Sequence, residues 1–222
     1  MRRRGYYKYV EKRYVKIFIA VQALLYLTFM WLDISGTGGS KWIKYVSIAL
    51  CLGFSLLLST KGGERLVTAA LGFTLAADTF LLLLDTAYAM GVALFYVVQA
   101  LYFVRIYRSN GRRSALFARL VLFLTAAAAL WKLELLTPLN LLAALYFTAF
   151  VCNTVQSLSI KNGLFSLGLI LFLCCDICVG VHNAPELFPE MLRGFADVGM
   201  WLFYLPAQVL ITLSGKTAFR PY

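Results

Sequence analysis

The chain has 222 residues, of which 61% are hydrophobic and 14% are charged. A soluble domain of this composition would expose a large apolar surface to water, so the composition excludes a soluble globular protein and indicates a lipid environment. The formal net charge of +11 is compatible with nucleic-acid binding. The Lys and Arg residues lie in the gaps between apolar runs, however, where basic residues of membrane proteins signal topology. We therefore expect a membrane protein with no nucleic-acid partner.

Eight apolar runs follow one another along the chain. The first, residues 15–32, directly follows a basic N-terminal segment (1–14) and ends without a small-residue cleavage site, so we expect a retained signal anchor. The other seven runs cover residues 42–58, 66–84, 87–106, 116–131, 135–155, 164–181 and 198–213. Each is close to the ~20 residues that a helix needs to cross a bilayer. The weakest of these predictions are the break between the third and fourth runs at residues 85–87 and the fifth run, which is short.

These runs predict an all-α fold, a polytopic integral membrane bundle of about eight transmembrane helices. We expect one transmembrane domain over residues 1–222, with the helical bundle at 15–213 and a short cytoplasmic tail at 214–222. With the N-terminus inside, seventeen Lys and Arg residues face the cytoplasm and four face the outside. The positive-inside rule therefore places both termini in the cytoplasm. The compact build with short loops suggests a bacterial cytoplasmic membrane.

Two parts of the chain resemble each other. The third run contains LGFTLAAD, ending at Asp78, and the seventh contains LGLILFLCCD, ending at Asp176. Each is followed by a run with a glutamine in apolar sequence, Gln99 in the fourth and Gln208 in the eighth. This pattern predicts a parallel duplication of four helices, as in transporters whose sites lie between repeats.

The two intramembrane carboxylates are the first candidates for chemistry. An ionised Asp within hydrocarbon is costly, so such residues normally face a bundle interior and have a function. Asp78 and Asp176 lie about twelve and thirteen residues into their helices, which places them at a similar depth. Two carboxyl groups in one apolar pocket can divide the roles of general acid and base. The alternative is that each merely fixes helix packing. Lys44, at the start of the second run, is a possible counter-ion.

The five cysteines all lie inside apolar runs, where we expect free, buried thiols rather than disulfides. Cys175 and Cys178 form a CxxC pair, but no second ligand pair lies nearby in the sequence. We therefore expect no metal and no other cofactor.

The polar residues of these runs resemble the YhhN family, the multi-spanning membrane proteins that include the lysoplasmalogenases. The resemblance rests on residues of the second, third, fourth, seventh and eighth runs, namely Lys44, Asp78, Gly91, Phe95, Gln99, Tyr102, Gly168, Asp176, Tyr204, Ala207 and Gln208. Three positions depart from the family pattern, which has Pro where this chain has Tyr45, Gly where it has Ala77, and His where it has Gln99. Glutamine can hydrogen-bond a substrate but cannot exchange protons near neutral pH.

The resemblance implies hydrolysis of the vinyl ether bond of a lysophospholipid or a related lipid. On this hypothesis Asp78 and Asp176 are catalytic. Lys44 either influences the charge of these two carboxyl groups or contacts the phosphate of the substrate. The head group would be oriented by Gln99, Tyr102, Tyr204 and Gln208. Two alternatives remain at this point, a lipid-binding or small-solute transport protein that uses the same polar pocket, and a structural protein with no pocket.

Overall fold

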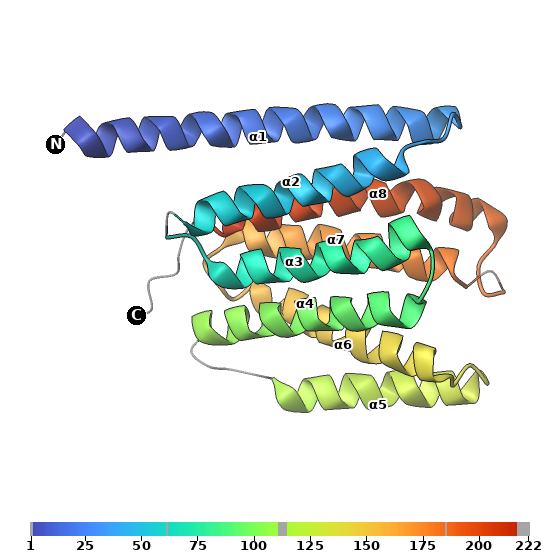
Figure 1. The fold of residues 1–222 in the computed structure, drawn as a ribbon. Helices are drawn as coiled ribbons and strands as arrows, with labels where there is room; N and C mark the ends of the chain where they lie inside the picture. Colours follow the sequence, from blue (N-terminus) through green and yellow to red (C-terminus); the bar gives the residue numbers. More distant parts are fainter. Residues whose placement is uncertain (1, 61, 111–114, 185, 217–222) are drawn as a thin grey trace.

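The computed structural model describes residues 2–60, 62–110, 115–184 and 186–216, with side chains from residue 13 onward. These residues form eight α-helices and no strand (Figure 1). The helices are α1 (Arg2–Ser35), α2 (Lys41–Ser59), α3 (Arg65–Asp78), α4 (Tyr88–Ser109), α5 (Leu116–Lys132), α6 (Pro138–Ser157), α7 (Gly163–His182) and α8 (Glu190–Ser214). A short π-helical segment, η1 (Thr79–Leu84), continues α3. The prediction of an all-α bundle is confirmed.

Seven of these helices are long and apolar enough to cross a membrane within the described residues. The exception is α5, whose 17 residues are at the lower limit for a transmembrane helix. The helices therefore support an integral membrane protein with about the predicted number of spans.

Several boundaries differ from the predicted runs. Helix α1 begins at Arg2 and α8 at Glu190, so both extend well beyond the apolar residues that revealed them. Lys61, Arg112, Arg113 and Arg220, which contributed to the predicted charge balance, lie outside the described residues, as does most of the predicted tail.

The chain reverses sharply between η1 and α4, as the break at residues 85–87 predicted. Asp85 and Ala87 both adopt left-handed backbone conformations, with φ of 50° and 51°. Such conformations cost energy in residues other than glycine, so the packing of the adjoining helices must hold them in place. Gly91 allows this packing, because a Cβ atom at this position would lie 2.5 Å from a side-chain atom of Leu81.

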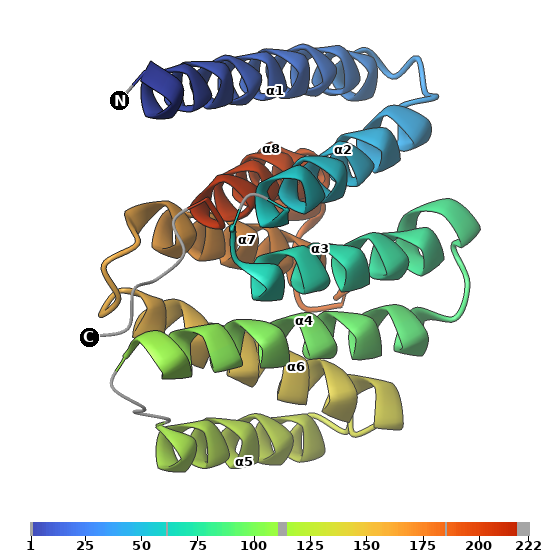
Figure 2. The ribbon, with the colours of Figure 1, turned by 60° about the vertical axis from the view of Figure 1, so that its left-hand side comes forward.

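The two halves of the bundle repeat one packing pattern. Helix α3 packs against α4 as α7 packs against α8, and α4 lies against α6 as α8 lies against α2. These contacts agree with a duplication of four helices, but α1 packs against α8 whereas, within the described residues, its counterpart α5 does not pack against α4. Helices α1 and α5 lie at opposite edges of the bundle (Figures 1 and 2).

Small residues bring α7 and α8 into close contact. A Cβ atom at Gly168 would lie 2.7 Å from a side-chain atom of Ile211, and one at Gly199 would lie 2.8 Å from the sulfur of Cys178. Such small-residue contacts are the usual means of close helix association in membranes. They also bury Cys178, and all five cysteines are free thiols.

Pro206 links α8 to the peripheral helix α1. Proline has no backbone N–H, so the Leu202 carbonyl lacks its normal helical donor. The Tyr26 hydroxyl of α1 donates to this carbonyl at 3.1 Å. A local break in the α8 hydrogen bonding thus becomes an attachment point for α1.

We call the side of the bundle that holds the start of α1 and the end of α8 the basic end. There, Arg105 is fully buried and forms an ion pair with Glu64 at 2.7 Å. Arg105 also donates to the hydroxyl and carbonyl oxygens of Ser214, at 2.8 and 3.1 Å. Arg105, which the charge balance counted on the cytoplasmic side, therefore lies inside the bundle at the basic end, where Glu64 of the α2–α3 turn pairs with it.

Candidate functional site

Asp78 is held by a tyrosine of another helix. It is the last residue of α3, where the chain passes into the π-helical segment η1, and only 6% of its surface is exposed. The Tyr204 hydroxyl of α8 lies 2.9 and 2.8 Å from the two carboxylate oxygens and donates to them. π-Helical turns occur frequently at functional sites because they re-aim the side chains of a helix. Here a buried carboxyl group is fixed at such a turn.

Asp176 has a tyrosine partner of its own. The Tyr146 hydroxyl of α6 donates to one of its carboxylate oxygens. Asp176 is half-buried on α7, four helices further along the chain than Asp78. The two predicted catalytic residues thus form two separate Asp–Tyr pairs, with no hydrogen bond joining one carboxyl group to the other.

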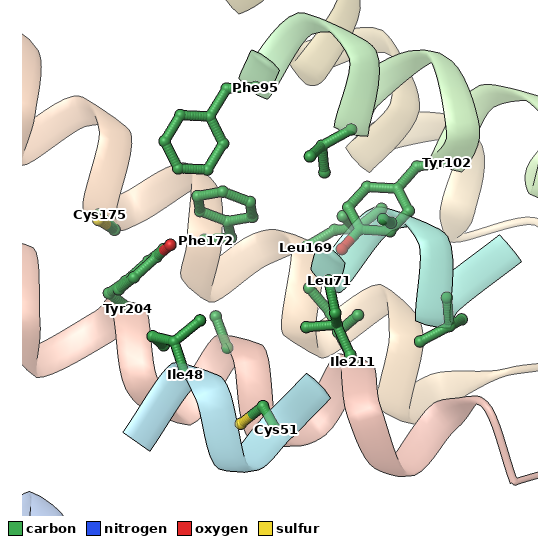
Figure 3. Packing of buried hydrophobic residues seen from close by; sticks show 14 of the residues in the cluster. Ile48, Cys51, Leu71, Phe95, Tyr102, Leu169, Phe172, Cys175, Tyr204 and Ile211 are labelled. Carbon is green, nitrogen blue, oxygen red and sulfur yellow. The ribbon is translucent and has the colours of Figure 1, made fainter. Parts of the chain in front are cut away.

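Aromatic rings join the two pairs. Phe172, one turn before Asp176 on α7, has its ring centroid 5.5 Å from that of Tyr204 and 5.8 Å from that of Phe95. Phe95 in turn lies 6.1 Å from Tyr146. Figure 3 shows Phe95, Phe172 and Tyr204 converging on this region. Both carboxyl groups therefore border one apolar wall, where electrostatic interactions are stronger than in water.

Cys175, beside Asp176 in the chain, also lies in this region. Its thiol is buried. The ring contacts of Phe95 and Phe172 thus link the two Asp–Tyr pairs.

A second set of predicted residues is buried without hydrogen-bond partners. Both amide atoms of Gln208 and the hydroxyl of Tyr102 lack partners, although the two side chains are fully buried. The same is true of the Thr74 hydroxyl, one turn before Asp78. Helix α3, which carries Thr74 and Asp78, packs against both α4 and α8. Buried polar groups in proteins are nearly always satisfied, so each of these atoms leaves hydrogen-bonding capacity for water or a polar ligand.

Gln99, one turn before Tyr102 on α4, belongs to a hydrogen-bonded network. Its side-chain oxygen accepts from Asn153 of α6 at 2.9 Å, while its Nε2 has no partner. The Asn153 side-chain oxygen accepts from Arg119 of α5 at 2.8 Å. The sequence analysis missed Arg119 as a site neighbour, because it treated this residue as a cytoplasmic charge.

Lys44 is placed apart from both catalytic candidates. It forms an ion pair with Asp33 at 2.8 Å, and its Nζ lies 4.7 Å from the ring centroid of Trp201. Trp201 packs edge-on against Tyr204, with 5.2 Å between the ring centroids. The Trp201 ring thus separates Lys44 from the Asp78–Tyr204 pair. The sequence analysis did not single out Asp33, the carboxylate partner of Lys44.

Tyr146 and Asp33 were also missed, although Tyr146 left a signal in the sequence. The buried face of α6 includes Tyr146, Phe150, Asn153 and Ser157, which recur at helical spacing. A polar stripe of this kind in an apolar run marks the side of a helix that faces the bundle interior.

The sequence profile of the YhhN family matches residues 39–215. The chain belongs to the YhhN family. The matched region contains all seven predicted site residues together with Tyr146 and Arg119, and it begins after α1 has ended. Searches of curated proteins and of solved structures found no match. The features that this YhhN-family chain shares with its family therefore lie in α2 to α8.

Proposed function

We propose that this YhhN-family protein is a lysoplasmalogenase-like hydrolase that cleaves the vinyl ether bond of a lysophospholipid within the membrane. The observation that carries the proposal is the pair of intramembrane carboxyl groups, each fixed by a tyrosine hydroxyl from another helix. Family membership supplies the substrate class. The unpartnered polar atoms of Gln99, Tyr102 and Gln208 supply hydrogen-bonding capacity for the substrate and water.

The reaction requires one acid and one base. The acid protonates the vinyl carbon remote from the ether oxygen, which forms a C–H bond and leaves an oxocarbenium ion at the neighbouring carbon. Water adds to that carbon while the base accepts its proton. The resulting hemiacetal breaks the C–O bond to the glycerol oxygen; that oxygen takes a proton, and the hemiacetal hydroxyl loses one to become the aldehyde carbonyl. The products are a fatty aldehyde and a glycerophospho-alcohol.

We assign the acid and base roles jointly to Asp78 and Asp176. Tyr204 and Tyr146 hold the two carboxyl groups in place, and the aromatic wall excludes bulk water from the cationic intermediate. Gln99, Tyr102 and Gln208 orient the polar part of the substrate. We assign the phosphate to Lys44, which is a cation held at the end of the bundle opposite the basic end.

We also propose the orientation and location of the protein. The positive-inside rule assigns the basic end to the cytoplasm, with both termini on that side. The short connections between helices suit a bacterial cytoplasmic membrane.

The test is aldehyde release by the purified, detergent-solubilised protein from 1-alkenyl lysophospholipids. We expect Asp78→Asn and Asp176→Asn to abolish release while the protein remains folded. The matched control is Asp85→Asn, because Asp85 is an exposed carboxylate at the η1–α4 turn and should tolerate the change. Release that survives both substitutions would refute the two-carboxylate mechanism.

The second candidate is a protein that binds or transports a lipid or small solute without turnover. The observation that favours it is Pro206, which removes one backbone hydrogen bond from α8 two residues before the buried amide of Gln208, since irregular backbone in transmembrane helices often accompanies transport sites. Lysolipid binding with no aldehyde release across several head groups would support this candidate.

A further inference from the structure

Three side chains form a hydrogen-bonded chain from α5 across α6 to α4. Arg119 of α5 donates to Oδ1 of Asn153 on α6 at 2.8 Å. Asn153 Nδ2 in turn donates to Oε1 of Gln99 on α4 at 2.9 Å, and to the Gln99 backbone carbonyl at 2.8 Å. Asn153 and Gln99 are both fully buried, so this chain crosses the interior of the contact between α4 and α6.

The direction of this chain is fixed at its first member. A guanidinium has five N–H donors and no acceptor, so it always presents a donor to Asn153. The Asn153 atom that faces it must therefore be the amide oxygen, and the amide NH₂ group faces Gln99. Because an NH₂ group of an amide only donates, the Gln99 atom that receives it must be Oε1. Both amides thus have one orientation, whatever else Arg119 contacts.

The consequence is that Gln99 Nε2 is directed away from Asn153. This nitrogen is buried and has no hydrogen-bond partner among the described residues. Gln99 lies one turn, about 6 Å, beyond Phe95 on α4. The Phe95 ring contacts Tyr146 and Phe172, and so belongs to the aromatic wall between the two Asp–Tyr pairs. A buried N–H without an acceptor is costly, which makes an acceptor oxygen the group that best completes this position.

We propose that Asn153 is a positioning residue that fixes Gln99 as a hydrogen-bond donor, so that the site takes a ligand with an acceptor oxygen at this point. The proposal rests on the proposed function for the identity of the ligand, a lysophospholipid, whose ether, hydroxyl and phosphate oxygens can all accept. Asn153 acts through Gln99 and does not contact the ligand itself. An acceptor in place of the Gln99 donor should therefore oppose binding of the same lipid.

Asn153→Asp reverses the polarity of the site while keeping its shape. The carboxylate still accepts from Arg119, and the neighbouring guanidinium favours its ionised form. An ionised carboxylate has no N–H for Gln99, so Gln99 is free to turn and donate its own Nε2 to the carboxylate. Oε1, an acceptor, then takes the place of Nε2. The matched control is Gln156→Glu, the same chemical change at the other amide oxygen that accepts from Arg119, at 2.6 Å.

The test is equilibrium binding of 1-hexadecyl lysophosphatidylcholine by the purified full-length protein. This probe has a saturated ether in place of the vinyl ether, so binding is measured without turnover. Asn153→Asp should weaken binding roughly tenfold or more, since a buried polar group is then left facing another acceptor. Its melting temperature should stay close to that of the unchanged protein, because the bond from Arg119 persists. Gln156→Glu should bind as the unchanged protein does.

A double-mutant cycle separates positioning from a general structural role. Gln99→Met removes the donor and should also weaken binding of the probe. In the Gln99→Met background, Asn153→Asp should have no further effect, because Asn153 acts only through Gln99. Additive losses in the double variant, or unchanged binding in Asn153→Asp alone, would overturn the proposal.

The outcome is distinct from that of the aldehyde assay. A non-additive cycle without aldehyde release from 1-alkenyl lysolipids would support the role of Asn153 and refute the hydrolase function. Aldehyde release that depends on Asp78 and Asp176, with unchanged probe binding in Asn153→Asp, would support the hydrolase and refute the role of Asn153. Failure of the unchanged protein to bind the probe would overturn the positioning proposal, and aldehyde release would then decide the proposed function alone.

Discussion

Replacing Gln208 by methionine should stabilise the protein while impairing its activity. Gln208 is fully buried, and neither its amide nitrogen nor its amide oxygen has a partner. Burying an amide without hydrogen bonds costs about 1–3 kcal/mol in mutational data. Methionine keeps the unbranched shape and removes the polar atoms. Taking the lower part of that range, we expect Gln208→Met to raise the free energy of unfolding by about 1 kcal/mol.

The matched control is Asn153→Leu, which removes a buried amide that is fully hydrogen-bonded. Asn153 donates to the backbone and side-chain oxygens of Gln99 and accepts from Arg119. Its loss should cost about 2 kcal/mol, because membrane hydrogen bonds average about 0.6 kcal/mol and the bond from Arg119 is stronger. The two amide substitutions should therefore have opposite signs.

The assay is thermal unfolding in detergent, followed by aldehyde release. For a chain of this size, 1 kcal/mol corresponds to about 2–4 °C. We expect the melting temperature to rise by that amount in Gln208→Met and to fall by about 4–8 °C in Asn153→Leu. A fall in Gln208→Met as large as that in Asn153→Leu would refute the reasoning, since both amide atoms of Gln208 would then have partners in the folded protein.

Three further predictions concern the site, the basic end and the topology. Tyr204→Phe removes the hydrogen bond to Asp78 and should lower aldehyde release roughly tenfold or more, as a steady-state assay would show. Glu64→Ala leaves fully buried Arg105 without its carboxylate and should lower the free energy of unfolding by about 3 kcal/mol, measured by denaturant titration. A reporter domain fused after Lys216 should be active only on the cytoplasmic side.

The two substitutions each have a control. Tyr45→Phe also removes a tyrosine hydroxyl that bonds outside the site, to Thr79, and should retain most activity. Glu186→Ala removes an exposed carboxylate and should barely change stability. Equal losses in Tyr45→Phe and Tyr204→Phe would argue against a special role for the Asp78 pair. A reporter active on the outside would reverse the proposed orientation.

The sequence by itself determined the class of protein and the number of helices. The length of an apolar run is a local property, because a helix satisfies its own backbone hydrogen bonds and needs about 20 apolar residues to cross the bilayer. The chain reversal at residues 85–87 is also a local property of the sequence. The family was also evident from local patterns around Asp78 and Asp176, and the matching family profile confirms it.

Only the tertiary structure decided which side chains meet. The rotation of each helix about its axis and the identity of its neighbours depend on packing across the whole bundle. A short stretch of sequence does not determine them. Asp176 therefore has Tyr146 as its partner, and Lys44 has Asp33. Arg105 is the clearest case. Its position near a helix end is typical of a loop charge, yet the fold brings Glu64 beside it and so makes its burial possible.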